Sequence, residues 1–323
     1  MFANRSTEID YQGIDTLIFI GCYQRRLPVS LARMMENAYD WEHLPHVHES
    51  SFQAIELVSQ GDWGWQAIVT LPSHQQQHLE LLVDKSKNYW ATTVLSGAAK
   101  GVEIHTQANH VADREVDISV NFYLPKSFAK VLMFLNIAGR ALPFTLYKTV
   151  ARKLGITRIA RGDTTQTSIL ITLQAQYSVL YDEDELLMSG RQEALDRRRS
   201  AQAGAPSKLE AGSSAESGSS AEALSLGTQT ELKRHLPKLV EFGRHRYVLN
   251  RWQDQWVIYA ADCAHLLGPL QGAEIDPAGI ITCPWHGYRF SVLTGENCSS
   301  DKKNLRRPPI ISVVDDELIL KRC

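Results

Sequence analysis

Cysteine is scarce in this sequence, with five residues in 323: Cys22, Cys263, Cys283, Cys298 and Cys323. So few scattered thiols do not make the disulfide framework of a secreted protein, so we expect a reducing, cytoplasmic environment. Residues 1–20 also lack the basic start, apolar stretch and cleavage site of a signal peptide. The formal net charge is −2, so the chain lacks the excess of positive charge that a nucleic-acid partner would require.

Acidic residues are absent between Ile118 and Gly162, a segment that contains eight basic residues. Within it, residues 131–147 are strongly apolar, but they are short for a membrane-spanning helix and are interrupted by Arg140 and Pro143. Two interpretations remain open. The segment could be a buried helix pair that covers a sheet, or a basic amphipathic helix in peripheral contact with a membrane surface.

Aromatic residues are absent between Tyr181 and Phe242. Of the 28 residues from 201 to 228, 18 are Ala, Gly or Ser. Such a stretch buries too little apolar area to offset the entropy that it would lose on ordering. We therefore predict a flexible linker over residues 200–229, between a first domain of residues 1–199 and a second of residues 230–323.

The patterns on either side of this linker predict different fold classes. In the first domain we expect a strand over residues 16–24, a helical segment over 28–44, alternating strands from 51 to 124, and a closing helix over 182–199. An antiparallel sheet with helices makes this an α+β domain, whose sheet could wrap a hydrophobic cavity. The second domain consists of short strands and turns, so we expect it to be all-β.

The second domain contains Cys-x-His in "CAHLLGPL" (263–270) and, seventeen residues later, Cys-x-x-His in "CPWHGYRF" (283–290). Two thiolates and two imidazoles could bind zinc. A [2Fe–2S] cluster fits better, because each loop supplies one cysteine and one histidine, with glycine and proline beside them to allow close backbone approach. Residues 230–323 resemble the Rieske iron–sulfur domain. The resemblance implies that Cys263 and Cys283 bind one iron, and that His265 and His286 bind the other.

Three histidines crowd the segment "ENAYDWEHLPHVH", residues 36–48. In non-haem oxygenases, two histidines and one carboxylate hold Fe(II) and leave positions open for oxygen and substrate. The pattern Asp40-x-x-His43-x4-His48 resembles the iron-binding segment of Rieske non-haem iron oxygenases, the ring-hydroxylating oxygenase alpha-subunit and O-demethylase group. The resemblance implies that His43 and His48 are ligands. They are five residues apart, so a regular helix would not aim both at one metal, and Pro45 between them would break or bend the helix. On helical spacing alone, His46 is the alternative to His48.

The third iron ligand should be a distant carboxylate. Residues 180–195 resemble the closing helix of the O-demethylase branch, which implies Asp184. The rivals are Asp182, Glu185 and Asp163, and an acidic run at a helix start could instead serve the helix dipole.

The resemblance implies a helix-grip (START-like) fold for the first domain, a homo-oligomer, and an electron path in which Asp40 bridges His43 to a cluster histidine of a neighbouring subunit. Family members usually carry the Rieske domain first. Here the order is reversed, which leaves the docking of the two domains open.

The implied activity is that of an oxidoreductase, a Rieske mono- or dioxygenase that uses O2 to hydroxylate or oxidatively demethylate a hydrophobic small molecule. The chain has no glycine-rich dinucleotide fingerprint, so we expect a separate NAD(P)H-dependent reductase or a ferredoxin to supply electrons. The alternative is a non-catalytic electron-transfer protein with a lipid-like ligand-binding cup. Trp63, Trp65, Trp90, Phe122 and Phe144 could line such a pocket or fill the core.

Overall fold

The computed structural model describes residues 7–97, 99–128, 165–202, 223–299 and 303–322. The chain divides into two compact units, Met1–Met188 and Ser189–Cys323, and the long helix α5 (Thr165–Gln202) spans the division. The apolar segment 131–147, with Phe144, and the rival ligand Asp163 lie outside the described residues. Within the described ranges, no helix is both long and apolar enough to cross a membrane.

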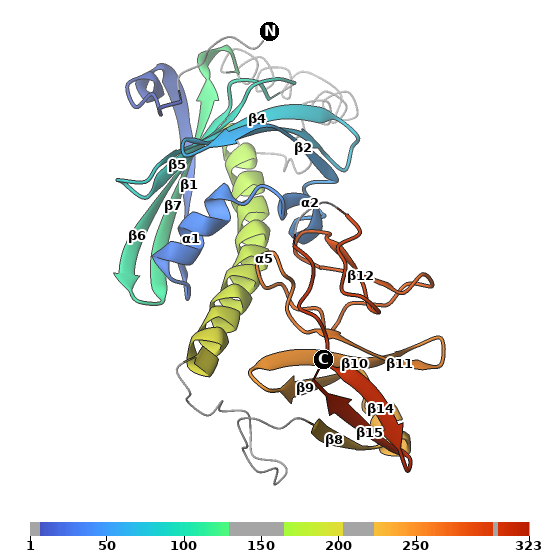
Figure 1. Ribbon diagram of the computed structural model, residues 1–323. Coiled ribbons are helices and arrows are strands. Elements are labelled where there is room, and N and C mark those ends of the chain that lie inside the picture. The colour runs from blue at the N-terminus through green and yellow to red at the C-terminus, as the bar shows by residue number, and fades with distance from the viewer. Residues whose placement is uncertain (1–6, 98, 129–164, 203–222, 300–302, 323) are drawn as a thin grey trace. The chain divides into compact units, whose positions relative to one another are not determined.

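The first unit is built on a seven-stranded antiparallel sheet in the order β1-β7-β6-β5-β4-β3-β2 (Figure 1). A short 3-10 helix, η1 (Gly13–Thr16), leads into it. The strands are β1 (Leu17–Leu27), β2 (Ala54–Gly61), β3 (Gly64–Thr70), β4 (Gln76–Asp84), β5 (Tyr89–Val94), β6 (Glu103–Ala112) and β7 (Glu115–Pro125). β1 and β2 are the two edge strands of this sheet, so the helical segment that connects them runs from one edge to the other. The predicted α+β class is confirmed.

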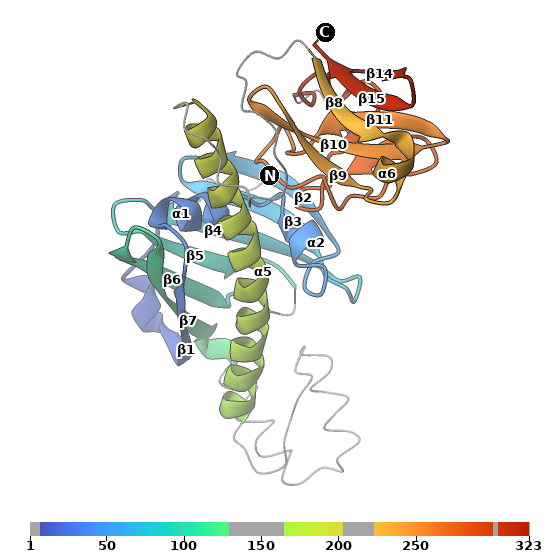
Figure 2. The same ribbon diagram turned by 90° about the horizontal axis from the view of Figure 1, so that it is seen from below.

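One face of this sheet packs against α5, as two views at right angles show (Figures 1 and 2). Alternate residues of β7 supply part of this face and are at most 4% exposed: Val116, Ile118, Val120, Phe122 and Leu124. The Phe122 ring meets Tyr177 of α5 edge to face at 5.1 Å, and Tyr23 of β1 stacks on Tyr181 at 6.1 Å. Trp65 and Trp90 are also buried, so they belong to the core.

Gly21 allows α5 to approach β1 closely. It lies at a β-bulge with φ of 150°, and a Cβ atom there would come within 2.6 Å of the Leu170 side chain. One turn further along, the Gln174 side-chain amide donates to the carbonyl of Cys22 at 2.7 Å. These contacts fix the position of α5 along the sheet, and therefore the position of the acidic residues further along the helix.

Two predicted boundaries are wrong. The closing helix, expected over 182–199, begins at Thr165 and extends to Gln202. The predicted linker 200–229 is too wide at both ends, because β8 occupies Ala223–Thr228 and α6 occupies Gln229–Lys233. β8 pairs with β15, and its Leu224 and Leu226 pack on the second unit's core. The Ala, Gly and Ser content of this stretch indicated a linker. Two alternating leucines are nevertheless enough to form an edge strand. Residues 203–222 lie outside the described residues.

The second unit contains three small antiparallel sheets, in the orders β11-β10-β9, β12-β13 and β14-β15-β8. The strands are β9 (Lys238–Phe242), β10 (His245–Trp252), β11 (Gln255–Ala260), β12 (Ile280–Thr282), β13 (Arg289–Ser291), β14 (Ile310–Val314) and β15 (Glu317–Lys321). Its core includes Val240, Tyr247, Leu249, Leu318 and Leu320, each at most 5% exposed. Apart from the residues of α5 and the single turn α6, the described part of this unit is the predicted all-β fold.

Candidate metal centres

The histidine segment folds as two helices with a break between them. α1 (Leu31–Tyr39) begins at Ser30, whose side chain accepts from the backbone N–H of Arg33, and ends at Asp40, which leaves helical geometry. α2 (Leu44–Val47) is a single turn. Pro45 lies in its first turn, where a missing backbone N–H costs nothing. The prediction that Pro45 bends a helix between two ligands is therefore wrong: Pro45 helps α2 to begin.

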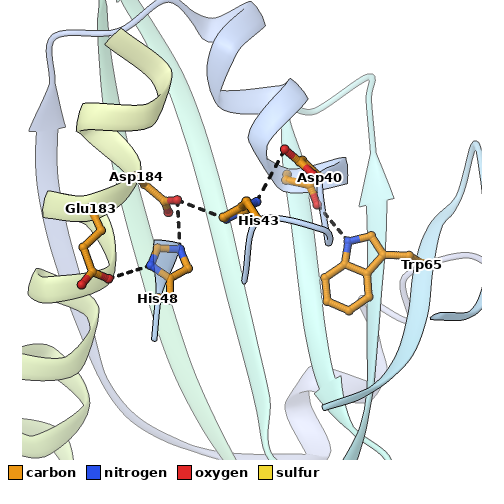
Figure 3. Close-up of polar contacts among 7 residues, drawn as sticks. Asp40, His43, His48, Trp65, Glu183 and Asp184 are labelled. Carbon is orange, nitrogen blue, oxygen red and sulfur yellow. Dashed lines mark hydrogen bonds and ion pairs between the residues drawn. The ribbon is translucent and has the colours of Figure 1, made fainter. Parts of the chain in front are cut away.

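His43 and His48 flank α2 at its two ends, outside the constraint of regular helical spacing. Both are 2% exposed. Figure 3 shows their rings turned toward Asp184 of α5: His43 Nε2 lies 3.4 Å and His48 Nε2 3.1 Å from Asp184 Oδ1. The structure thus brings the three predicted ligands together, with one potential ligand atom of each within 4.8 Å of the others. His46 is exposed on the turn between them and does not join this group.

Each imidazole has a second carboxylate on its other ring nitrogen (Figure 3). His48 Nδ1–H donates to Glu183 Oε2 at 2.7 Å, and His43 Nδ1 lies 3.7 Å from Asp40 Oδ2. Asp40 is three residues before His43, as the sequence indicated, but Glu183 was not predicted. Carboxylates behind the imidazoles are typical of metal sites, where they fix the ring orientation and raise the basicity of the ligand nitrogen.

The electrostatics of this group favour a cation. Burial disfavours a charged His43, yet the carboxylates of Asp184 and Asp40 outweigh it and raise the pKa of His43 to about 10. Burial would raise the pKa of Asp184, but hydrogen bonding to His43 and His48 lowers it instead. Both ring nitrogens of His43 are buried, and they lie 3.4 Å from Asp184 Oδ1 and 3.7 Å from Asp40 Oδ2. Positive charge is stabilised here, whether it is carried by a proton or by a metal ion.

The distances fit a metal. Ligands in adjacent positions around an octahedral ion, with bonds of about 2.1 Å, lie about 3.0 Å apart. The two nitrogen-to-oxygen distances of 3.1 and 3.4 Å are close to that value. Two histidines and one carboxylate on one side of an ion are the ligand set of non-haem Fe(II) sites. The donor set and its spacing therefore fit a mononuclear metal.

The acidic run 182–185 is divided among separate partners. Asp182 and Glu185, one turn apart, both pair with Arg25 of β1 at 2.5 and 2.6 Å. Glu183 and Asp184 face the histidines instead. Because α5 begins at Thr165, the run lies deep within the helix, far from the N-terminal dipole. A capping role for Asp184 is therefore wrong, and the rivals Asp182 and Glu185 are held by Arg25.

In the second unit, two loops place the Cys and His residues, and the two loops have the same backbone design. The N–H of Cys263 donates to the carbonyl of Gly268, and the N–H of Cys283 donates to that of Tyr288, both at 2.8 Å. Each loop also turns through a positive φ four residues after its cysteine, at Leu267 (67°) and Gly287 (65°). The first loop follows β11, and the second connects β12 to β13.

These loops bring the four predicted ligands together. Cys263 and Cys283 are buried, and the rings of His265 and His286 lie edge to face with centroids 4.6 Å apart. The two thiols are paired: hydrogen bonding from Cys263 lowers the pKa of Cys283 to about 5 and raises that of Cys263. Tyr288 lies edge to face with His265 at 5.0 Å. Two buried cysteine sulfurs in contact with each other, beside two imidazoles, fit a cluster with mixed ligation.

Residues 222–307 match the family of Rieske [2Fe-2S] domains. This span contains both loops. Residues 222–307 are a Rieske [2Fe–2S] domain. The Rieske domain therefore begins at β8, earlier than residue 230, and it follows the first unit in the chain. It provides for a [2Fe–2S] cluster, whose chemistry is the transfer of single electrons.

Comparison with solved structures gives weak, partial similarities to each unit. The ferredoxin of carbazole 1,9a-dioxygenase from Nocardioides aromaticivorans IC177 is 20% identical and covers 32% of this chain and 100% of its own, with a TM-score of 0.29. Norcoclaurine synthase from Thalictrum flavum is 12% identical and covers 50% of this chain and 100% of its own, with a TM-score of 0.30. Neither similarity assigns an activity. A comparison with curated proteins found no match.

The Rieske domain leaves no room for a side chain at Gly268. A Cβ atom there would lie 2.7 Å from Cys283 Sγ and 3.2 Å from the Trp285 ring. We expect Gly268→Ala to lose most of the cluster absorbance, because the added methyl group displaces a ligand sulfur. Gly272→Ala is the matched control, since a Cβ there would meet nothing within 4 Å. Visible absorbance and iron content of the two variants check this; full cluster content in Gly268→Ala would contradict it.

Proposed function

We propose that the protein is a Rieske-type non-haem iron oxygenase that hydroxylates or oxidatively demethylates a hydrophobic small molecule. The observation that carries this proposal is the buried group of His43, His48 and Asp184 in the same chain as a Rieske domain. A Rieske cluster transfers electrons and performs no chemistry on a substrate by itself. A second metal centre in the same chain could use the electrons that the Rieske cluster delivers.

The residues of the helix-grip domain would hold a ferrous ion through His43, His48 and Asp184. When bound, the cluster supplies single electrons and the ferrous ion supplies oxygen-activating chemistry. The neutral imidazoles and one carboxylate are hard ligands that suit Fe(II) and leave other positions to oxygen and substrate.

Electrons would come from outside the chain. The sequence contains no dinucleotide fingerprint, so we propose a separate NAD(P)H-dependent reductase, or a ferredoxin, as partner. Asp40 would connect the two centres, because its carboxylate lies 3.7 Å from His43 Nδ1 and its side chain is only 7% exposed. In a homo-oligomer, Asp40 could receive the electron through the Rieske domain of a neighbouring subunit.

A non-catalytic redox protein with a lipid-like ligand in its helix-grip domain is the second candidate. The Rieske domain favours it as much as the first, because the redox role belongs to that domain alone. The two functions differ in iron content. The oxygenase requires three irons per chain, and the redox protein requires the two of its cluster.

Asp40→Asn should slow the electron path without removing either metal centre. The amide keeps the shape of the side chain but removes the charge that orients and polarises His43. We expect a chemical donor to reduce the cluster normally and iron to remain bound. Reoxidation of the reduced cluster by oxygen and substrate should slow by orders of magnitude. Stopped-flow absorbance measures this step; a wild-type rate in Asp40→Asn would mean that the electron takes another path.

A further inference from the structure

Glu183 makes the shortest contact that either histidine makes within the described site. Its Oε2 atom lies 2.7 Å from His48 Nδ1, whereas Asp40 lies 3.7 Å from His43 Nδ1. The Glu183 side chain is 30% exposed and His48 is 2% exposed. A carboxylate with access to water therefore turns inward to accept a hydrogen bond from a buried ring. Such a charge-assisted bond is stronger than a bond between neutral groups.

The backbone does not by itself fix the His48 ring. His48 follows α2 with φ of −106° and ψ of 47°, outside regular secondary structure. Its ring meets that of His43 edge to face, with centroids 5.1 Å apart, and lies 6.4 Å from the centroid of Phe52. The two polar contacts decide the orientation: Nδ1–H to Glu183 and Nε2 toward Asp184. If the ring rotated by half a turn, both contacts would be lost together.

We propose that Glu183 is a positioning residue that holds His48 with Nε2 presented to the metal. It donates no ligand atom; it acts through His48 by fixing the ring and by increasing the basicity of Nε2. This inference rests on the proposed function, because it assigns a role toward the mononuclear iron. It also explains why the acidic run contains a residue that neither pairs with Arg25 nor joins the ligand group.

The test is Co(II) binding to the full chain with its cluster oxidised, after mononuclear metal has been removed. We expect Glu183→Ala to weaken Co(II) binding by about 10- to 100-fold, as for other carboxylates behind a ligand histidine. Glu183→Gln should fall between Glu183→Ala and wild type, because its amide oxygen can still accept from Nδ1–H. The Co(II) electron paramagnetic resonance spectrum should change in Glu183→Ala, which a merely structural role would not produce.

Asp182→Asn is the matched control. Asp182 is the adjacent acid on α5, but it pairs with Arg25 and not with a histidine. We expect it to bind Co(II) as wild type does. Wild-type affinity and spectrum in Glu183→Ala would overturn the positioning role while leaving the metal site intact. Wild-type affinity in His48→Ala, measured in parallel, would overturn the proposed function itself, so the two failures are distinguishable.

Discussion

Asp184→Ala should remove one iron of three per chain and abolish turnover, while the spectra of the oxidised and reduced cluster stay unchanged. Asp184 Oδ1 lies 3.1 Å from His48 Nε2 and 3.4 Å from His43 Nε2, and the residue is 8% exposed. Its loss leaves two buried imidazoles with no shared anionic ligand. We expect ferrous affinity to fall by more than about 100-fold, beyond the range for outer carboxylates.

His43→Ala and His48→Ala should behave in the same way, and His46→Ala is their matched control. His46 lies on the same turn but is exposed, so we expect His46→Ala to keep its iron and its activity. Iron analysis and the reduced-minus-oxidised spectrum of each variant check the group. If His46→Ala lost the iron and His48→Ala kept it, the helical pair of histidines would be the true one.

His265 and His286 should show the second large effect. Replacement of either by cysteine should leave a [2Fe–2S] centre whose reduction potential falls, because thiolate donates more electron density than imidazole. Rieske centres have potentials of about −150 to +300 mV, and all-cysteine plant-type centres about −400 mV. We therefore expect a change of up to hundreds of millivolts, measured by redox titration.

Replacement of either histidine by alanine should lose the cluster, because one iron would then keep a single protein ligand. His286 is 6% exposed and its ring lies 4.6 Å from that of His265, so solvent has little access to supply a substitute. The visible spectrum of each alanine variant reports the outcome. A normal Rieske spectrum in either variant would contradict the ligand assignment.

The Rieske domain was the part of the molecule that the sequence predicted best. Its four predicted ligands lie on two short loops, and the loop conformation depends on neighbouring residues such as Gly268 and Gly287. Local sequence therefore carries most of the information. The alternation in β7 is similarly local, because each second residue of a strand faces the same side. The start of the domain was missed because Leu224 and Leu226 are isolated within a run of small residues.

The histidine and carboxylate site of the first unit could be predicted only in part. Asp184 came from resemblance, and sequence alone could not separate it from its neighbours. Successive helical residues point about 100° apart, so the acid that meets the histidines depends on how α5 is rotated. That rotation is set by distant contacts, such as Tyr23 with Tyr181 and Gly21 with Leu170. Glu183 was missed for this reason. The one sequence feature that could have indicated Glu183 was its position next to the predicted ligand Asp184.

The effect of Pro45 was misread because its position within a helix was unknown. Proline disrupts the interior of a helix but suits its first turn. The sequence gives no clear mark of where α1 ends, since Asp40 is not a usual helix stop. Once the chain leaves the helix at Asp40, Pro45 falls at the start of a new turn. His43 and His48 lie just outside the two ends of α2, so regular helical spacing does not keep them apart. Both can face Asp184 without a bend inside a helix.

The iron content of the purified full-length chain, combined with a search for a mononuclear ferrous signal, tests the central claim most directly. Anaerobic reconstitution should yield three irons per chain. Two should give the Rieske spectrum, and the third should be high-spin Fe(II) that disappears in Asp184→Ala without loss of the cluster. Two irons per chain, all in the cluster, with wild type and Asp184→Ala alike, would contradict the oxygenase and leave a redox protein.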